Sequence, residues 1–435
     1  MKQFSVLLLG FALFSFASCN CGNNGCGHND TYNVVVPPQI TPEAETKSFE
    51  PLLGNTEGKP QEIIDAIRDQ KVKRGFDPIA NAARKPKIYA TLPANMHGPD
   101  GMAVNPKTGT LFMSVPNFNR RPGDTGKKLN PAYIVTVSPD GKTEAVLNLD
   151  GIENIKLPTE QIGPMGLAFG PDGHLYVCDN QYFFDSNWKS RILRVLMDGD
   201  KPTGEVEVAV DGTKLSNAVL WHNDDLYLTD TFFDIEGKFG SGGIWRFPKE
   251  QILEAGRGDN LPIKVNPVTK EEDDPHILVL YSVTKVLGGG NGGPDGITVD
   301  SAGIIYSGFF GSGEIYRIVL DANGKPTTDL IHPAGEYFHC CDGIFYDKGT
   351  NKVYIADSAA NAIHAFTPPS IMEKPVFETI WENGNTDGAD GSLDQPCEVV
   401  IIGDRLIVVN FDWPFPELLN TVSDDPSTLS VIKLE

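Results

Sequence analysis

Four carboxylates and one amide recur at the same point of a repeated pattern in this sequence. Each stands at the start of an apolar run, as Asp295 does in PDGITVD. The five positions are Asp100, Asn217, Asp295, Asp342 and Glu398. Like charges that converge are unfavourable unless protons or a cation neutralise them. Because oxygen donors favour hard cations, we expect one divalent cation at this point, Ca²⁺ first and Mg²⁺, Mn²⁺ or Zn²⁺ as alternatives.

The tetrapeptide GPDG offers a simpler explanation for some of these residues. It occurs at 98–101, 170–173 and 293–296, and Pro-Asp-Gly is a common turn sequence. At 170–173 it separates two apolar runs, so Asp172 is predicted to be a plain turn residue. At 293–296 it precedes a run, and we expect Pro294 and Gly296 to shape a turn there. The alternative for each acidic residue is therefore a turn cap without chemistry.

The runs belong to a unit that the chain repeats six times. Each unit reads as a strand, a tight turn and a second strand, followed by a third alternating strand and usually a fourth. The paired first strands fall within 99–117, 164–180, 216–231, 294–310, 341–358 and 396–412. Four antiparallel strands repeated six times predict an all-β fold, a six-bladed β-propeller.

The last unit lacks a fourth strand because the chain ends after its third. Residues 87–94 have the missing outer-strand pattern, so we expect this N-terminal strand to close the ring. The predicted organisation is a signal peptide at 1–18, a tether with a short helix (60–72) at 19–86, and the propeller at 87–435.

The first strand of each blade would line the central channel, with the five oxygen-bearing residues at its top. The top connections are long and aromatic, and long loops often carry function. They supply the candidate substrate-binding residues Tyr182, Phe184, Trp188, Phe232, Phe233, Arg120 and His339. The alternatives are that the aromatic residues form loop core, that the Arg is solvated and that the His is structural.

The charge balance narrows the choice of partner. The 435 residues carry a formal net charge of −22 with a sequence pI near 4.7. Without a basic stripe, nucleic acid is not expected as a partner, since phosphate neutralisation dominates such binding. We expect a monomer that acts on a small-molecule substrate.

The N-terminus has the features of a bacterial export signal. Lys2 precedes an apolar stretch from Phe4 to Phe16 that is too short to span a bilayer stably. The following FASC resembles a lipobox, which predicts lipidation of Cys19 and a lipid-anchored protein of the cell envelope, periplasmic or surface-exposed. The alternative is an ordinary cleaved signal peptide. In the folded part, Cys340 and Cys341 are expected to pack rather than to form a bridge.

The segments NAVLWHNDDLYLTD and PDGITVDSAGIIYSG resemble those of the senescence marker protein/gluconolactonase family, more distantly related to squid-type diisopropylfluorophosphatase and paraoxonase. The resemblance covers about 90–435 and rests on short motifs. It implies a six-bladed propeller with one catalytic divalent metal at the top of the channel. By position, Asp100 and Asn217 would be ligands, and Asp295 a ligand and the base.

Two departures from the family pattern bear on activity. Met165 stands where related enzymes often supply an Asn, and Asp100 replaces the usual Glu. Asp342 and Glu398 are additional acidic residues that would compensate by contacting the metal. The resemblance implies a metal-dependent hydrolase, most often a lactonase. The alternative is a non-catalytic, surface-anchored propeller that binds a ligand or another protein, since a propeller does not imply an enzyme.

Overall fold

The computed structural model describes residues 52–118, 130–233, 241–269, 274–282, 287, 292–371, 373–415 and 418–434. These residues all belong to one compact unit, Thr46–Glu435. The predicted signal peptide, Cys19 and Arg120 lie outside the described residues.

Six sheets form the blades, and the strands of each sheet follow in order from the inner to the outer strand. Blades one and two comprise β2 (Met102–Val104), β3 (Leu111–Val115), β4 (Tyr133–Val137), β5 (Thr143–Asn148), and β6 (Pro164–Phe169), β7 (Leu175–Asp179), β8 (Ser190–Asp198), β9 (Lys201–Thr213). Blades three and four comprise β10 (Ser216–His222), β11 (Asp225–Phe233), β12 (Ser241–Pro248), β14 (Ile277–Tyr281), and β15 (Gly293–Val299), β16 (Ile305–Phe310), β17 (Ile315–Leu320), β18 (Pro326–His332). Blades five and six comprise β19 (Ile344–Asp347), β20 (Lys352–Asp357), β21 (Ala362–Phe366), β22 (Phe377–Glu382), and β23 (Pro396–Ile402), β24 (Arg405–Asn410), β25 (Thr428–Lys433), β1 (Lys87–Thr91).

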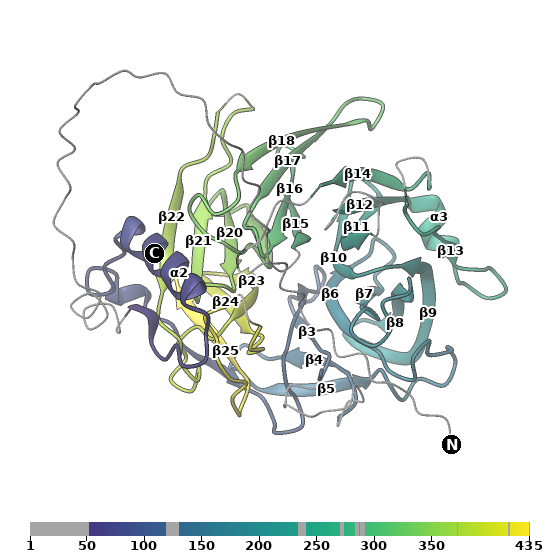
Figure 1. The fold of residues 1–435 in the computed structure, drawn as a ribbon. Helices are drawn as coiled ribbons and strands as arrows, with labels where there is room; N and C mark the ends of the chain where they lie inside the picture. Colours follow the sequence, from purple (N-terminus) through teal and green to yellow (C-terminus); the bar gives the residue numbers. More distant parts are fainter. Residues whose placement is uncertain are drawn as a thin grey trace, which may run out of the picture. The chain divides into compact units, whose positions relative to one another are not determined.

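The protein is a six-bladed β-propeller, which confirms the fold predicted from the repeats (Figure 1). Each inner strand contacts the inner strand of the next blade, and β2 of the first blade contacts β23 of the last. The last sheet takes its outer strand from the N-terminal side, because β1 pairs antiparallel with β25 from Lys87↔Val431 to Thr91↔Thr428.

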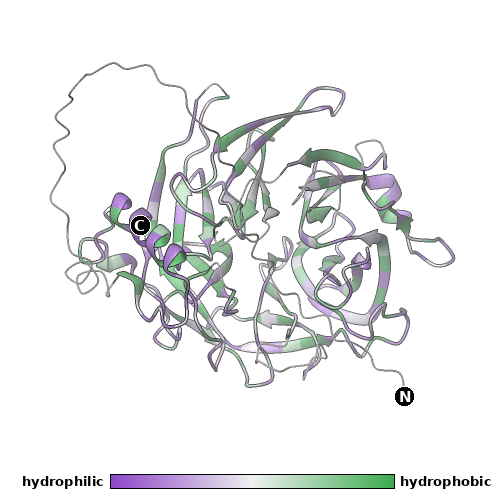
Figure 2. Ribbon diagram, in the orientation of Figure 1, coloured by the Kyte–Doolittle hydropathy of each residue, from purple (hydrophilic) through white to green (hydrophobic). Residues whose placement is uncertain are grey.

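Apolar residues of the strands are buried between neighbouring blades. Between blades three and four, for example, Tyr227 and Ile244 pack with Ile305 and Phe309. Full burial of such side chains contributes about 1.5–3 kcal/mol each. Figure 2 shows green, hydrophobic residues in the blade strands, interspersed with purple, hydrophilic ones. These interfaces fix the blades rigidly around the channel.

Glycine next to the channel residues lets the inner strands approach one another closely. A Cβ added to Gly101 would lie 2.5 Å from the Met165 carbonyl oxygen, and one on Gly166 would lie 2.7 Å from the Asn217 carbonyl oxygen. At Gly296 the added atom would lie 2.8 Å from the Ile344 nitrogen. Real Cβ atoms essentially never come within 3.0 Å of such atoms. The Gly in the Asp-Gly pairs is therefore required by blade packing.

The expectation of a turn at 293–296 was wrong, because these residues form the start of a strand. Pro294 and Gly296 lie inside strand β15, and Gly296 is absent from the residues with positive φ. The same tetrapeptide at 170–173 does form a turn, where Gly173 has a φ of 82°. Identical letters thus serve two different structures, and Asp295 is a strand residue.

Helix α2 (Gln61–Arg74) packs on the propeller instead of standing apart from it (Figure 1). Its Ile63 and Ile67 are buried with Ala360 and Ala362 of blade five. Arg74 forms a buried ion pair with Glu382 at 2.6 Å, and Lys71 donates to the Asn383 carbonyl at 2.8 Å. The helix predicted at 60–72 is therefore present, and it is fastened to the outer part of blade five.

Other short elements lie around the blades. A 3₁₀ turn, η1 (Ala82–Arg84), precedes β1. The long connection between β12 and β14 of blade three contains α3 (Lys249–Glu254) and β13 (Ile263–Lys264), which pairs parallel with β9. Cys178, Cys340, Cys341 and Cys397 are free and buried. Among the described residues, no helix is both long enough and apolar enough to cross a bilayer.

Candidate active site

A cavity of about 150 Å³ lies where the inner strands begin, at one end of the channel. Four of the five predicted oxygen-bearing residues line it together with the Met165 that departs from the family pattern. Its described lining residues are Asp100, Met165, Asn180, Phe183, Leu215, Asn217, Thr231, Phe232, Asp295, Phe310, Asp342, Gln395, Phe411 and Phe415. The structure thus brings together side chains from all six blades.

A hydrogen-bonded chain of an amide and two acids runs across blades three, four and five. Asn217 donates from Nδ2 to Asp295 Oδ2 at 2.6 Å. Asp295 and Asp342 share a hydrogen bond, and Ser358 donates to Asp342 Oδ2 at 2.6 Å. Two acidic groups can share such a bond only while one of them carries a proton.

The backbone around Asp295 is held by the neighbouring blade. Thr229 donates its hydroxyl to the Asp295 carbonyl at 2.5 Å, and Thr231 donates to the Pro294 carbonyl at 3.0 Å. Ser114 does the same in blade one by donating to the Met165 carbonyl at 2.8 Å. Hydroxyls on the second strands thus fix the position of the inner strands of the following blades.

Burial and mutual repulsion both raise the pKa of the channel carboxyls. The pKa of Asp295 is raised well above its usual value, first by burial and then by Asp342, Asp100 and Glu398. The pKa of Asp100 is raised by burial, Asp342 and Glu398. Burial raises the pKa of Asp342 to about 7 and that of Glu398 to about 8. A cation at this place would favour the charged forms of these groups.

Glu398, the fifth predicted ligand, is outside the lining of the cavity. Its Oε1 accepts the backbone N–H of Val399 at 2.8 Å. The side chain also lies against Gly343, since a Cβ there would approach Glu398 Oε1 to 2.5 Å. Although Glu398 is not a lining residue, its charge raises the pKa of Asp100 and Asp295.

The aromatic candidates divide into two groups. Phe232 lines the cavity and contacts Tyr182, with ring centroids 5.4 Å apart. Phe184 contacts Phe118 at 5.6 Å and packs against the core. Trp188 instead stacks on Phe233 at 5.7 Å, and Phe233 is buried in the core of blades two and three. Among these, Phe232 alone is a lining residue, with Tyr182 directly behind it.

His339 lies beneath α2 rather than at the cavity. Its imidazole hydrogen-bonds to the backbone of Ala66, and burial lowers its pKa. The structure thus gives His339 a contact with the helix, and His339 is not among the described lining residues of the cavity.

Sequence reasoning missed the part of the cavity wall that comes from blades four and six. Phe310 and Phe415 both line the cavity and contact each other at 5.8 Å, and Phe411 lines it as well. Trp413 stacks on Phe411 and Phe415 at 5.8 and 5.7 Å. The stretch NFDWPF at 410–415 was a usable signal, since it follows a second strand as the predicted aromatic loops do.

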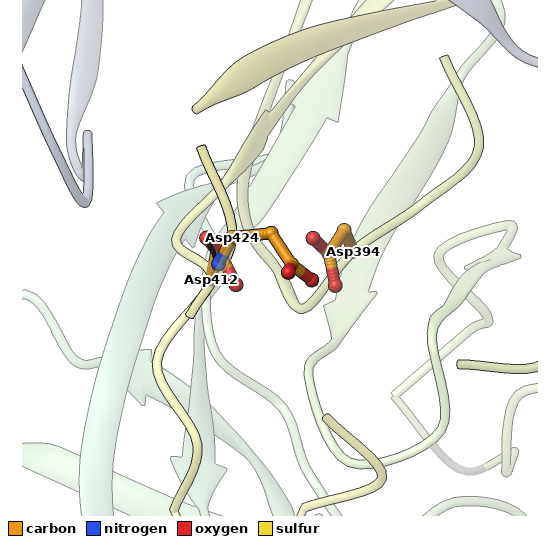
Figure 3. A group of neighbouring side chains, drawn as sticks. All are labelled: Asp394, Asp412 and Asp424. Carbon is orange, nitrogen blue, oxygen red and sulfur yellow. Dashed lines mark hydrogen bonds between the residues drawn. The ribbon is translucent and has the colours of Figure 1, made fainter. Parts of the chain in front are cut away.

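A separate acidic triad lies at the end of blade six. Asp394, Asp412 and Asp424 have oxygens within 4.8 Å of one another, a closeness that no other His, Cys, Asp or Glu triad of the described residues shows (Figure 3). Asp412 accepts from the backbone N–H of Asp424 at 2.8 Å and from Asn420 at 2.9 Å. These bonds fasten the loop before β25. The channel carboxyls are less tightly gathered than this triad.

The comparisons with known proteins bear on the fold. No protein-family model and no curated protein sequence matches the chain. A gluconolactonase from Xanthomonas campestris is 13% identical with a TM-score of 0.46, and 81% of this chain covers 95% of that one. For a periplasmic gluconolactonase from Pseudomonas aeruginosa the values are 14%, 0.45, 77% and 88%. For a PQQ-bound aldose sugar dehydrogenase from Streptomyces coelicolor they are 16%, 0.46, 80% and 98%. Such likeness concerns the fold and selects no activity.

The donor set suits a hard divalent cation. Asp100, Asn217, Asp295 and Asp342 offer carboxylate and amide oxygens to one small cavity. No Cys or His is among its described lining residues. Oxygen-only sets fit Ca²⁺, Mg²⁺ or Mn²⁺ better than Zn²⁺.

Proposed function

We propose that this protein is a divalent-cation-dependent hydrolase that opens a small lactone or ester in the channel cavity. The chain Asn217–Asp295–Asp342 at the wall of that cavity is the observation that carries the proposal. Buried acids with perturbed pKa values in a cleft are candidates for a functional site. The resemblance of the blade motifs to gluconolactonase-like enzymes supports the same reaction class.

The cation would be held by Asp100, Asn217, Asp295 and Asp342, with Glu398 adding negative charge behind them. The chemistry that it supplies when bound is polarisation of an ester carbonyl and stabilisation of negative charge on oxygen. Ca²⁺ is the first choice for this oxygen-only set.

Asp295 is the proposed general base. The Asn217 amide holds one of its oxygens in a fixed orientation, and Thr229 holds its backbone. A carboxylate so placed can accept a proton from water, a role that typically contributes about 10²–10⁴-fold. The apolar walls limit the access of bulk water, which strengthens charge interactions inside the cavity.

The test compares two Asp residues of the same tetrapeptide. Asp295→Asn should lower the kcat/KM of lactone hydrolysis in the presence of Ca²⁺ by at least about 100-fold. Asp172→Asn is the matched control, because Asp172 lies in the turn between β6 and β7 and pairs with Arg257 at 2.7 Å. This substitution should leave the rate unchanged. Hydrolysis that survives both chelation and Asp295→Asn would rule out the proposed reaction.

Met165 favours a second candidate function, a binding module without catalysis. Its thioether occupies the place where related enzymes often have an Asn, and it puts an apolar group into the cavity. Calorimetric titration with Ca²⁺ tests metal binding separately from catalysis. Ca²⁺ binding without turnover of any lactone or aryl ester would favour the binding module, and absence of Ca²⁺ binding would remove the metal proposal.

We also propose that the chain is a lipoprotein of the bacterial cell envelope, anchored through Cys19. The apolar stretch and the FASC sequence support this. Metabolic labelling with a radioactive fatty acid should mark the wild type and not Cys19→Ser. Labelling of both would contradict the anchor.

A further inference from the structure

The cavity offers mostly apolar surface to a ligand. Half of its described lining residues have side chains that form no strong hydrogen bonds. They are Met165, Phe183, Leu215, Phe232, Phe310, Phe411 and Phe415. Aromatic contacts connect several of them into a wall, since Phe310 lies 5.8 Å from Phe415 and Trp413 stacks on Phe183, Phe411 and Phe415.

The amide oxygens of two polar wall residues are already hydrogen-bonded. Asn180 Oδ1 accepts the backbone N–H of Tyr182 at 3.0 Å, and Gln395 Oε1 accepts that of Trp413. Because a backbone N–H can only donate, these bonds fix the orientation of both amides. Their nitrogens, Asn180 Nδ2 and Gln395 Nε2, are buried and have no hydrogen-bond partner among the described residues, so they add almost no polar surface to the cavity. Thr231 donates its hydroxyl to the Pro294 carbonyl.

The polar surface of the described lining is therefore concentrated in the acid and amide group. Asp100, Asn217, Asp295 and Asp342 are the groups that would face the reacting ester and the cation. A substrate with additional hydroxyls would have to bury them against Phe and Leu side chains. A hydroxyl that loses water without gaining a partner weakens binding.

The size of the cavity is consistent with one small ring. Its volume of about 150 Å³ is close to that of apolar protein cavities that accept a benzene-sized molecule. Aromatic walls bind such rings by edge-to-face and offset contacts.

We propose that the site takes an alkyl- or aryl-substituted lactone or ester, and that it discriminates against polyhydroxylated sugar lactones. This inference rests on the proposed lactonase function for its catalytic form. It concerns the walls of the cavity, whereas the proposed function concerns the acid and amide group.

The experiment uses the full chain with Ca²⁺ and two pairs of probes. Dihydrocoumarin and glucono-1,5-lactone are compared as substrates. Their non-hydrolysable amide counterparts, 3,4-dihydro-2-quinolinone and gluconolactam, are compared by calorimetric titration. We expect the kcat/KM for dihydrocoumarin to exceed that for glucono-1,5-lactone by at least about 100-fold. The lactams should follow the ranking of the lactones, so 3,4-dihydro-2-quinolinone should bind more tightly than gluconolactam.

Two wall variants and one control test the cause of the preference. Phe232→Ala and Phe415→Ala both change partly exposed residues, so folding should persist. Each should lower the quinolinone affinity about tenfold or more and leave any gluconolactam affinity unchanged. Phe76→Ala removes an aromatic ring that packs on Trp381 at 5.5 Å, away from the lining residues, and should change neither affinity.

The outcomes separate this inference from the proposed function. Faster hydrolysis of glucono-1,5-lactone, or tighter binding of gluconolactam, overturns the inference and leaves the lactonase function standing. Hydrolysis of neither lactone overturns the lactonase function. The lactam pair then still decides the inference: preferential quinolinone binding supports an apolar ligand site, and binding of neither lactam overturns it.

Discussion

At the scale of single residues, Asp295 and Asp172 show how context gives one side chain two meanings. Both follow Gly-Pro and precede Gly. Asp172 forms an ion pair with Arg257 in a hairpin turn. Asp295 is instead buried in an inner strand, with Asn217 and Asp342 as neighbours. The difference comes from the position of the tetrapeptide in the repeat, since at 293–296 it begins an inner strand and at 170–173 it connects two strands.

The raised pKa of Glu398 predicts a pH-dependent loss of stability in metal-free protein. Burial raises this pKa from 4.5 to about 8, so the folded state holds the proton more tightly than the unfolded state. The stability that Glu398 contributes is then complete below about pH 4.5 and declines as the pH rises toward 8. In chelator, the urea midpoint of the wild type should fall more between pH 5 and pH 8 than that of Glu398→Gln.

Glu144→Gln is the control for that comparison. Glu144 is exposed on the outer strand β5. The Glu144→Gln variant should therefore show the same pH dependence of the urea midpoint as the wild type. An unchanged pH dependence in Glu398→Gln would show that Glu398 does not carry the effect.

At the scale of the elements, the approach of neighbouring inner strands decides what the channel residues can be. Gly101, Gly166, Gly296 and Gly343 each meet the backbone of the next inner strand. Blades three and six have Ala218 and Val399 at the corresponding places, so the ring is not uniform. The carboxylates are positioned by these contacts as much as by their own hydrogen bonds.

Gly296→Ala should destabilise the protein by about 3 kcal/mol or more, because the new methyl group would overlap the backbone of blade five. The free energy of unfolding from denaturant titration measures this. Gly349→Ala is the matched control, since its nearest neighbour is the flexible Asp347 side chain at 3.2 Å and its φ is not positive. Equal small losses in the two variants would refute the packing argument.

The attachment of α2 gives a second prediction at this scale. Arg74→Ala should cost about 3–5 kcal/mol, because it leaves Glu382 buried without its cation. Changing both residues, to Met and Gln, should recover part of the loss. Arg68→Ala on the same helix removes a more exposed pair with Asp65 and should cost less than about 1 kcal/mol. A loss in Arg74→Ala no larger than in Arg68→Ala would contradict a buried, stabilising pair.

The sequence predicted the blades well because their signal is local and repeated. Alternating apolar runs and tight turns recur six times, and the first two strands of each blade extend at most two residues beyond the predicted segments. The convergence of Asp100, Asn217, Asp295 and Asp342 followed from rotational symmetry. What failed depended on contacts between distant segments. The buried amides of Asn180 and Gln395 and the docking of α2 on blade five leave no periodic trace in the sequence.

At the scale of the whole molecule, the last blade is assembled from both ends of the described chain. Its outer strand β1 comes from the N-terminal side, and the other three strands come from the C-terminal side. An unpaired outer edge would expose backbone groups that promote aggregation.

Truncation should therefore act in steps. A chain that begins at residue 52 keeps α2 and β1 and should unfold near the wild-type temperature. A chain that begins at residue 86 loses α2 with its buried pair and should unfold at a lower temperature. A chain that begins at residue 93 also lacks β1 and should aggregate or unfold at the lowest temperature. Thermal unfolding and size-exclusion chromatography measure both effects. Equal stability of the last two chains would show that β1 contributes little.

Because Trp413 stacks between Phe411 and Phe415, its fluorescence should report on the state of the cavity. Both of its neighbours line the cavity, whereas the aromatic rings that contact the other four tryptophans, Trp188, Trp221, Trp245 and Trp381, are outside its described lining. A ligand that displaces either Phe ring changes the surroundings of this one indole. The emission spectrum of Trp413 would then report ligand binding without any label. Trp413→Phe would abolish this ligand-dependent change, while the fluorescence of the other four tryptophans would remain.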